Sequence, residues 1–408
     1  MARRRWNGFA VTVLSSVALV LGTAPAASAL PSDSRLIEIT LPDRNGEIPS
    51  QWLTYAGPPR ATVLLPADYD PNRTYPLLLL LHGLYSNHSS WSRTGEGQIV
   101  TTAAGFDGII VMPEGASGWY TDWWNNGQRG NPAWESYLLD EVVPQIAEQF
   151  PIRPERRWHA IAGVSMGGLG AAYLAGRLPG YFGSVAILSG LVDTHLALGQ
   201  GAYHSLTAEN AAKQPLDPNA VYGPDFQPYS LGHDPVNLVR NLGHTRVFMA
   251  AGNGIPTEDG QPYTMENTDP LAEAAAIRPA SDTYAAALNA AGIPYTYLPG
   301  DGVHDWPKFR TELRDALAWG MFQPVDEAPT TWVSDTIATH GRIWGIDYRF
   351  DTPPSSLARL SRSGDDLSIS PAGSDVELDF PGGCAVHVST PATLTIPAPD
   401  SDRCTPGS

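Results

Sequence analysis

The chain has 408 residues, of which 42% are hydrophobic, and its 42 acidic and 25 basic side chains give a formal net charge of -17. This length exceeds one ordinary hydrophobic core and allows two domains. A surface this acidic repels phosphate groups, which disfavours nucleic acids and anionic lipid surfaces as partners. The two cysteines exclude a fold held together by many disulfides and any multi-cysteine metal site.

Residues 1–29 have the composition of a cleaved export signal. Three arginines precede an apolar stretch from Phe9 to about Leu21, and small residues follow at positions 27–29. The apolar stretch is too short to span a bilayer, and no later segment is long and apolar enough to do so. We therefore expect a secreted or cell-envelope protein with no transmembrane segment in the mature chain, in which Cys384 and Cys404 can form a disulfide.

From about residue 35 to residue 320, apolar runs typical of strands alternate with helical stretches. The expected strands are 36–41, 61–65, 77–81, 109–112, 159–163, 185–188, 246–251 and 295–298, and the expected helices are 134–150, 166–177, 270–291 with an interruption at Pro279, and 306–321. Several strands are continuously apolar, which is typical of strands covered by helices on both faces. The pattern predicts a mostly parallel α/β sheet with flanking helices over residues 30–323.

The sequence changes character after Phe322. Residues 324–330 are rich in proline and acidic side chains and are typical of a linker. Short alternating segments follow at 342–350, 366–370, 375–380, 385–389 and 392–396, separated by Pro, Gly, Ser and Asp. These segments predict a small all-β domain over residues 331–408.

The sequence Gly163-Val164-Ser165-Met166-Gly167 fits the pattern G-x-S-x-G. It follows an apolar strand and opens a helix rich in small residues, which is the setting of a nucleophilic serine on a tight strand-to-helix turn. Such a turn exposes the Ser165 hydroxyl at the end of the strand and lets the Met166 amide stabilise an oxyanion. The alternative is a glycine-rich turn that only packs a helix against a strand.

A second oxyanion donor is expected from the loop after the apolar run 76–81. That run ends at His82-Gly83-Leu84, so the Leu84 amide is the candidate donor. His82 could act as a base, but a histidine that holds the loop in place is the preferred interpretation, because a better placed base follows later in the chain.

His304 lies directly after the last expected strand of the sheet and before the last expected helix. A base in that loop can reach a serine at the same edge of the sheet, in the chain order serine, acid, histidine. The four histidines between positions 195 and 244 lack metal-ligand spacing and are expected to be surface or packing residues. The acid stays open at this point among Glu258, Asp259, Glu266, Asp269 and Glu273.

Six short motifs lie between residues 35 and 321. They are Leu-His-Gly-Leu at 81–84, Gly-Trp-Tyr-Thr-Asp-Trp at 118–123, Trp-Glu-Ser-Tyr-Leu at 134–138, Gly-Val-Ser-Met-Gly-Gly at 163–168, Ala-Gly-Asn-Gly at 251–254 and Gly-Val-His-Asp-Trp at 302–306. Together they resemble the esterase family that contains the antigen 85-type mycolyltransferases and the S-formylglutathione hydrolase-like esterases. The resemblance implies an α/β-hydrolase fold, and it favours Glu273 as the acid because the family acid lies in a Leu-x-Glu context. Asp259 is the alternative.

The resemblance also implies a function, with one departure. Mycolyltransferases of this type have Asp-Gly-Leu-Arg at the oxyanion loop, where this chain has His82-Gly-Leu-Tyr85. We therefore expect an esterase that passes the acyl group to water, with acyl transfer to a cell-envelope sugar as the alternative. A third hypothesis, from another class, is a catalytically inert envelope-binding protein.

The expected substrate is an acyl ester, such as a lipid or sugar ester of the envelope, and the expected mechanism needs no metal or organic cofactor. Tyr85 and Trp123 are the candidates for the substrate cleft. Trp119, Tyr120 and Trp124 are further candidates for such a cleft, but core and rim packing explains these three residues and Trp123 equally well.

Overall fold

A computed structural model describes residues 33–50, 52, 57–124, 132–196, 200–211, 213, 216–257 and 269–397. The expected export signal, the alternative acid Asp259 and Cys404 lie outside these residues. Within the described part of the chain, none of the helices combines the length and the apolar character that a membrane span requires.

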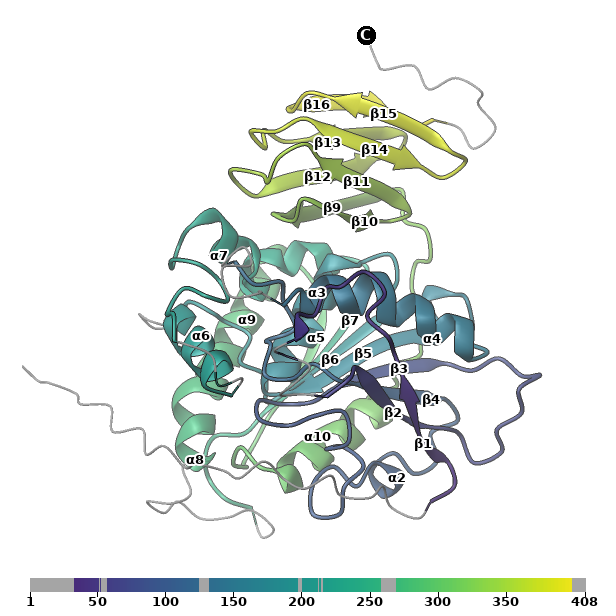
Figure 1. The fold of residues 1–408 in the computed structure, drawn as a ribbon, viewed down its shortest axis with the longest axis vertical. Helices are drawn as coiled ribbons and strands as arrows, with labels where there is room; N and C mark the ends of the chain where they lie inside the picture. The colour runs from purple at the N-terminus through teal and green to yellow at the C-terminus, as the bar shows by residue number, and fades with distance from the viewer. Residues whose placement is uncertain are drawn as a thin grey trace, which may run out of the picture.

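An eight-stranded sheet forms the centre of the larger part of the molecule (Figure 1). Its strands are β1 (Leu36–Thr40), β2 (Arg60–Leu64), β3 (Leu77–Leu81), β4 (Ile109–Pro113), β5 (His159–Val164), β6 (Ser184–Leu188), β7 (Arg246–Ala251) and β8 (Tyr295–Pro299), in the order β1-β2-β4-β3-β5-β6-β7-β8. The strands from β4 to β8 run parallel, whereas β1 and β2 pair antiparallel at one edge. The predicted mostly parallel sheet is confirmed.

Helices cover both faces of this sheet. One face carries α3 (Trp134–Ser136), η1 (Tyr137–Val142), α4 (Val143–Gln149), α5 (Met166–Arg177) and α9 (Arg278–Ala291), and the other carries α2 (Ile99–Thr102) and α10 (Trp306–Trp319) (Figure 1). Alternate leucines of β3 enter two different core clusters: Leu77, Leu79 and Leu81 belong to one, and Leu78 and Leu80 belong to the other. Burial on both faces therefore explains why this strand is continuously apolar.

The remaining helical segments lie mostly in the insertion between β6 and β7 and just before α9. They are η2 (Arg156–Trp158), α6 (Gln200–Ala211), α7 (Pro228–Gly232), η3 (Pro235–Leu242), α8 (Asp269–Ala272) and η4 (Glu273–Ile277). The expected helix 270–291 is thus three consecutive segments. Pro279 lies in the first turn of α9, directly after the π-helical segment η4, so the hydrogen bond that a proline cannot make falls where one helical pattern gives way to the other.

The C-terminal part consists of two antiparallel four-stranded sheets packed face to face (Figure 1). Their strands are β9 (Thr331–Thr336), β10 (His340–Ile343), β11 (Ile346–Phe350), β12 (Ala358–Ser363), β13 (Asp366–Ile369), β14 (Val376–Phe380), β15 (Cys384–Val388) and β16 (Ala392–Thr395). The expected single segment 342–350 is a hairpin that turns at Trp344 and Gly345, both at positive φ. Cys384 is disulfide-bonded.

Buried polar side chains join the two parts. Arg177, at the end of α5, donates to the Glu135 carboxylate within the larger part. The same guanidinium donates to Thr336 Oγ1 at 3.1 Å and to Tyr348 Oη at 3.0 Å in the β domain. The Asn241 side chain exchanges two hydrogen bonds with the backbone of Asp335. The interface therefore depends on hydrogen bonds that are shielded from water.

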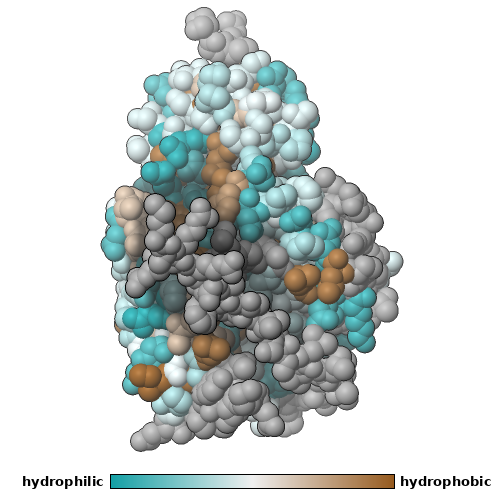
Figure 2. All heavy atoms as spheres, turned by 90° about the vertical axis from the view of Figure 1, so that its left-hand side faces the viewer, coloured by the Kyte–Doolittle hydropathy of each residue, from teal (hydrophilic) through white to brown (hydrophobic). Residues whose placement is uncertain are grey.

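A cavity of about 700 Å³ opens beside this interface. Its walls come from the α3 and α7 regions and from the loops that follow β9 and β11, and they include Trp124, Tyr229 and Ile337. Figure 2 shows apolar side chains gathered where the larger part of the molecule meets the β domain. Since neither Ser165 nor His304 lines the cavity, it is separate from the expected nucleophile.

Replacing Arg177 with methionine should destabilise the protein strongly. The substitution leaves the Glu135 carboxylate, with only 5% of the residue exposed, without its guanidinium partner. Breaking a buried ion pair from one side costs about 3–5 kcal/mol, to be measured by urea unfolding. Arg342→Met is the control, because Arg342 and Asp347 form an exposed pair and the expected loss is about 1 kcal/mol or less. Equal losses in the two variants would contradict this account of the interface.

Candidate active site

Ser165 lies between the end of β5 and the start of α5 with φ 57° and ψ -120°. This backbone conformation is strained for a residue with a side chain, and it persists because the neighbouring residues leave room for the turn. A Cβ atom at Gly163 would lie 2.1 Å from the carbonyl oxygen of Gly167, and a Cβ atom at Gly167 would lie 2.6 Å from that of His82. The glycines therefore allow the turn to form against the β3 loop.

His304 contacts Ser165 from the loop between β8 and α10. Its Nε2 atom lies 2.8 Å from Ser165 Oγ, although the two residues are 139 positions apart. The His304 amide donates to the carbonyl of Asp269, and the neighbouring Asp305 caps α10 by accepting from the Lys308 amide. These bonds hold the imidazole above the end of the parallel strands.

Glu273, the first residue of η4, accepts a hydrogen bond from His304 Nδ1 at 2.7 Å through Oε2. Its Oε1 atom accepts from the Gly252 amide at 2.6 Å and lies 2.9 Å from Ser189 Oγ. Burial alone would raise the pKa of Glu273, but the hydrogen bonds from His304, Gly252 and Ser189 outweigh burial and hold the pKa below its ordinary value. Glu273 is therefore placed to accept a hydrogen bond from His304 Nδ1, and the opposite ring nitrogen, Nε2, faces Ser165.

The Ala-Gly-Asn-Gly motif brings the acid and the histidine loop together. A Cβ atom at Gly252 would lie 2.4 Å from the Gly302 carbonyl oxygen and 2.9 Å from Glu273 Cγ. The Gly254 amide donates to the same carbonyl at 2.9 Å, and Gly254 has φ 81°. Glycine at these positions allows three backbone segments to approach closely enough for the Gly252 amide to reach the carboxylate.

The loop after β3 lies against the nucleophile. A Cβ atom at Gly83 would be 3.4 Å from Ser165 Cβ, so the Leu84 amide follows directly on the residue that contacts the serine. Among the described residues, neither the Leu84 amide nor the Met166 amide bonds a loop or side-chain acceptor.

His82 is 1% exposed and belongs to the scaffold of this loop. Its Nδ1 atom lies 2.8 Å from the Gly83 carbonyl oxygen, and its Nε2 atom lies 3.1 Å from the Gly115 amide. The Tyr120 hydroxyl accepts from the His82 amide and donates to the His82 carbonyl. These contacts occupy both ring nitrogens and fix the loop, which is the role expected for this histidine.

Several of the aromatic residues considered for the substrate cleft are buried in the structure. Trp123 is 4% exposed, packs edge-on against Trp52 with ring centroids 4.9 Å apart, and donates to the Gly118 carbonyl. For Trp123, this burial and these contacts favour core packing over a place in a substrate cleft. Trp119 and Tyr120 are also buried, whereas Trp124 is 37% exposed and lines the cavity beside the β domain.

Tyr85 is the expected cleft residue that the structure leaves accessible. It is 58% exposed and has φ 59°, and its amide donates to Ser117 Oγ at 3.2 Å. This bond fixes the backbone directly after Leu84 and leaves the Tyr85 ring at the surface.

Among the acids that the sequence left open, Glu258, Asp259 and Glu266 lie outside the described residues. Asp269 contacts His304 through its backbone carbonyl, and Glu273 is the acid whose carboxylate bonds the imidazole. The structure thus brings Ser165, His304 and Glu273 together in one hydrogen-bonded chain.

Two buried residues next to Glu273 escaped the sequence analysis. Ser189 follows β6 and Glu312 lies on α10, and the Ser189 hydroxyl lies 3.0 Å from Glu312 Oε1. A signal for Glu312 was present, since it falls on the apolar face formed by Phe309, Leu313 and Ala316.

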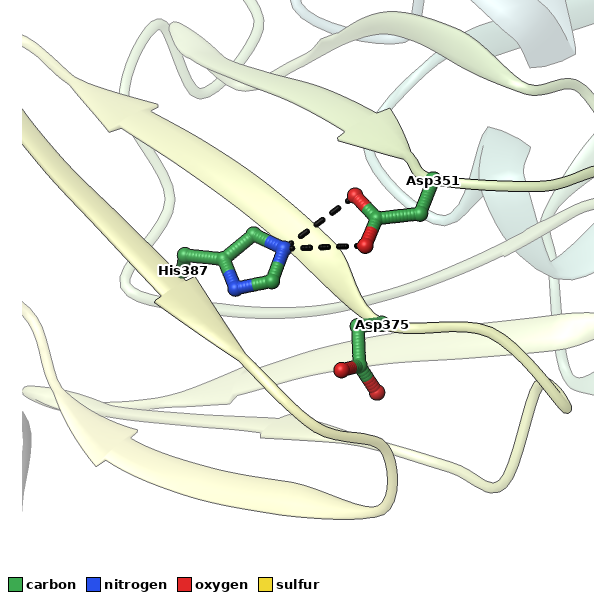
Figure 3. Close-up of side chains that lie close together, drawn as sticks. All are labelled: Asp351, Asp375 and His387. Atoms are coloured by element: carbon green, nitrogen blue, oxygen red, sulfur yellow. Dashed lines mark hydrogen bonds and ion pairs between the residues drawn. The ribbon is translucent and has the colours of Figure 1, made fainter.

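Among the described residues, one group of three has potential metal-ligating atoms within 4.8 Å of one another: Asp351, Asp375 and His387 (Figure 3). They lie in the β domain, away from the serine, and two of them are exposed. His387 Nε2 is 3.1 Å from both oxygens of Asp351, and this hydrogen bond raises the pKa of His387. This surface hydrogen bond accounts for the proximity of His387 and Asp351.

The chain is similar in sequence to known proteins over the region that contains these residues. The sequence model of a family described as putative esterase matches residues 55–319. Esterase Rv1288 of Mycobacterium tuberculosis is 30% identical over 290 residues, which cover 68% of this chain and 60% of the relative. The diacylglycerol acyltransferase/mycolyltransferase Ag85A of Mycobacterium leprae is 28% identical over 320 residues, which cover 75% of this chain and 88% of the relative.

Solved structures agree in fold. MPT51 of Mycobacterium tuberculosis has a TM-score of 0.51 at 19% identity, with 72% of this chain and 98% of that chain covered. The α/β-hydrolase fold expected from the resemblance is thereby confirmed. The family match spans about two thirds of this chain and encloses Leu84, Ser165 and His304. The protein therefore belongs to the esterase family of α/β-hydrolases, together with antigen 85-type relatives.

Proposed function

We propose that this protein is a serine carboxylic-ester hydrolase that passes the acyl group to water through an acyl-enzyme. The observation that carries the proposal is the hydrogen-bonded chain from Ser165 through His304 to Glu273. A hydroxyl, an imidazole and a carboxylate in this order are the arrangement that activates a serine for attack on a carbonyl group.

In the first step, Ser165 Oγ attacks the ester carbonyl while His304 Nε2 takes its proton. The Leu84 and Met166 amides donate to the oxyanion of the tetrahedral intermediate, and Met166 does so from the N-terminus of α5. Glu273 stabilises the imidazolium that forms. His304 then returns the proton to the leaving alcohol, and the acyl group stays on Ser165.

In the second step, water loses a proton to His304 and attacks the acyl-enzyme. The same oxyanion donors act again, and His304 returns its proton to Ser165 as the free acid leaves. All groups in both steps are backbone amides or side chains of this chain, and none requires a bound cofactor.

Water is preferred as acceptor because His82 and Tyr85 differ from the Asp and Arg of the sugar-binding loop in mycolyltransferases. His82 is buried, with both ring nitrogens engaged in the loop, so it offers no polar group to a sugar. Acyl transfer to a cell-envelope carbohydrate is the second candidate, and the similarity to Ag85A over 75% of the chain favours it.

Residues 1–29 support export, so the proposed substrate is a lipid or sugar ester outside the cytoplasm. The third hypothesis, an inert envelope-binding protein, predicts a serine without activation. The short contact between Ser165 and His304 argues against it.

Replacing Ser165 with alanine should lower hydrolysis of a p-nitrophenyl ester by at least about 10³-fold, because no hydroxyl remains to form the acyl-enzyme. Wild-type protein should also be labelled by a fluorophosphonate probe, and Ser165→Ala should not. The exposed Ser356 provides the control variant, Ser356→Ala, which should keep both properties. Turnover or labelling that survives in Ser165→Ala would show that another residue is the nucleophile.

Product analysis separates the two acceptors. Incubation of the protein with a model ester and an excess of trehalose should yield free acid as the main product, measured by mass spectrometry. An excess of acyl-trehalose over free acid would contradict hydrolysis and show that acyl transfer to a sugar is the function.

Replacing Glu273 with glutamine should reduce kcat by about 10²–10⁴-fold, because the neutral amide neither fixes the histidine tautomer nor stabilises its cation. Asp269→Asn is the comparison variant, because the Asp269 backbone carbonyl accepts from the His304 amide whereas the hydrogen bond to the imidazole comes from Glu273. A larger loss in Asp269→Asn than in Glu273→Gln would show that the wrong acid has been assigned.

A further inference from the structure

A second buried carboxyl group lies behind Glu273. Glu312 projects from α10, the helix on the sheet face opposite to α5 (Figure 1), and its side chain is 1% exposed. Its Oε1 atom lies 3.0 Å from Ser189 Oγ, and the same hydroxyl lies 2.9 Å from Glu273 Oε1. One serine thus bridges two carboxyl groups in the interior of the protein.

The number of available protons decides how this bridge works. The Ser189 hydroxyl has one proton and can donate to only one of the two carboxyl groups. If both groups were ionised, the other contact would join two acceptors with no hydrogen between them, and two like charges would share a buried site. A protonated Glu312 removes the conflict, because it donates to Ser189 Oγ while Ser189 donates to Glu273.

Which carboxyl group keeps the proton follows from their other contacts. Glu273 already accepts from His304 Nδ1 and from the Gly252 amide, as a carboxylate does. Glu312 Oε2 has no hydrogen-bond partner within the described part of the chain. An ionised oxygen buried without a donor is costly, whereas the carbonyl oxygen of a neutral carboxyl group is less so.

Few other charges face Glu312. Lys308 Nζ, one turn earlier on α10, lies 3.6 Å from Oε1, and its stem packs against Gly302. The His304 imidazole bonds Glu273, which lies between it and Glu312. Among the elements packed against α10, β6 and α2 contain no charged residue, and the only charged residue of β7 is Arg246, which bonds Gly320 at the far end of the helix.

We propose that Glu312 holds a proton in the folded protein at neutral pH and acts, through the Ser189 hydroxyl, as a positioning residue for Glu273. The hydrogen-bonded chain then runs from Glu312 to Ser189 to the carboxylate that orients His304. This inference rests on the proposed function for the role of Glu273. Loss of the Glu312 proton removes a donor from the chain and adds a negative charge close to the His304–Glu273 pair.

The surroundings of Glu312 place the loss of its proton in a pH range in which the protein can be studied. Burial, together with the negative charge of Glu273, raises the pKa of Glu312 to about 8. In the unfolded chain the group has an ordinary pKa near 4.5. Between these two values the folded protein holds a proton that the unfolded chain has released, so Glu312 makes stability fall as pH rises from about 4.5 to about 8.

Glu312→Gln tests the proton without relying on activity. The free energy of unfolding is measured by urea denaturation from pH 5 to pH 9 for the wild type and the variant. We expect the variant to gain stability relative to the wild type as pH rises through this window, whatever the constant difference at low pH. The infrared band of a protonated carboxyl group should also disappear in the variant. Parallel stability curves and an unchanged band would overturn the proposal.

Asp315→Asn is the matched control, since it makes the same chemical change at an exposed position on the same helix. Its stability should not gain on that of the wild type between pH 5 and pH 9. A gain equal to that of Glu312→Gln would trace the effect to the net charge of the protein and overturn the assignment to Glu312.

The positioning role is tested by the pH profile of kcat/KM. Glu312→Leu, which cannot donate to Ser189, should lose roughly 10- to 100-fold at pH 6–7, and Glu312→Gln should recover most of that loss through its amide donor. The wild-type profile should change slope near pH 8, and the Glu312→Gln profile should not. Wild-type behaviour of Glu312→Leu would overturn the positioning role. Absence of ester hydrolysis in the wild type would instead refute the proposed function, while the unfolding experiment would still report the proton.

Discussion

The molecule depends on a close approach of backbone segments at the turn around Ser165. The serine is held at positive φ, and the turn fits only because Gly163 and Gly167 have no side chain where the β3 loop and the first turn of α5 meet. The strain is balanced by the buried sheet on one side and the helix on the other. This arrangement aims the hydroxyl at His304 and keeps the Met166 amide open beside it.

The second constraint is electrostatic. The site contains two carboxyl groups in a region closed to water, and their contacts separate their behaviour: Glu273 is surrounded by donors, whereas Glu312 has an oxygen with none among the described residues. Unequal surroundings of this kind let neighbouring acids hold different protonation states at one pH. The orientation of the imidazole thus depends on residues from η4, the end of β6 and α10, which meet only in the folded chain.

The elements that local patterns determine could be predicted from the sequence. The parallel strands, α5, Ser165 and His304 follow from apolar runs and from a glycine-serine motif in its proper setting. Glu273 required a family resemblance, because several acids in one stretch are equivalent until the chain is folded. Strands β9 and β12 were missed because polar residues occupy much of each segment. Trp123 could not be assigned to a core or to a cleft from the sequence, because an aromatic residue has the same pattern in both.

Helix α5 has a property that neither its motif nor its packing suggests alone. Its first residue follows the serine, and its last residue, Arg177, bonds Thr336 and Tyr348 of the β domain. A helix of 12 residues is about 18 Å long, so both regions are attached to one short rigid rod. Truncation of the chain before residue 331 would remove Thr336 and Tyr348 and leave the buried Arg177 guanidinium with fewer partners, at the end of the same helix that begins beside Ser165.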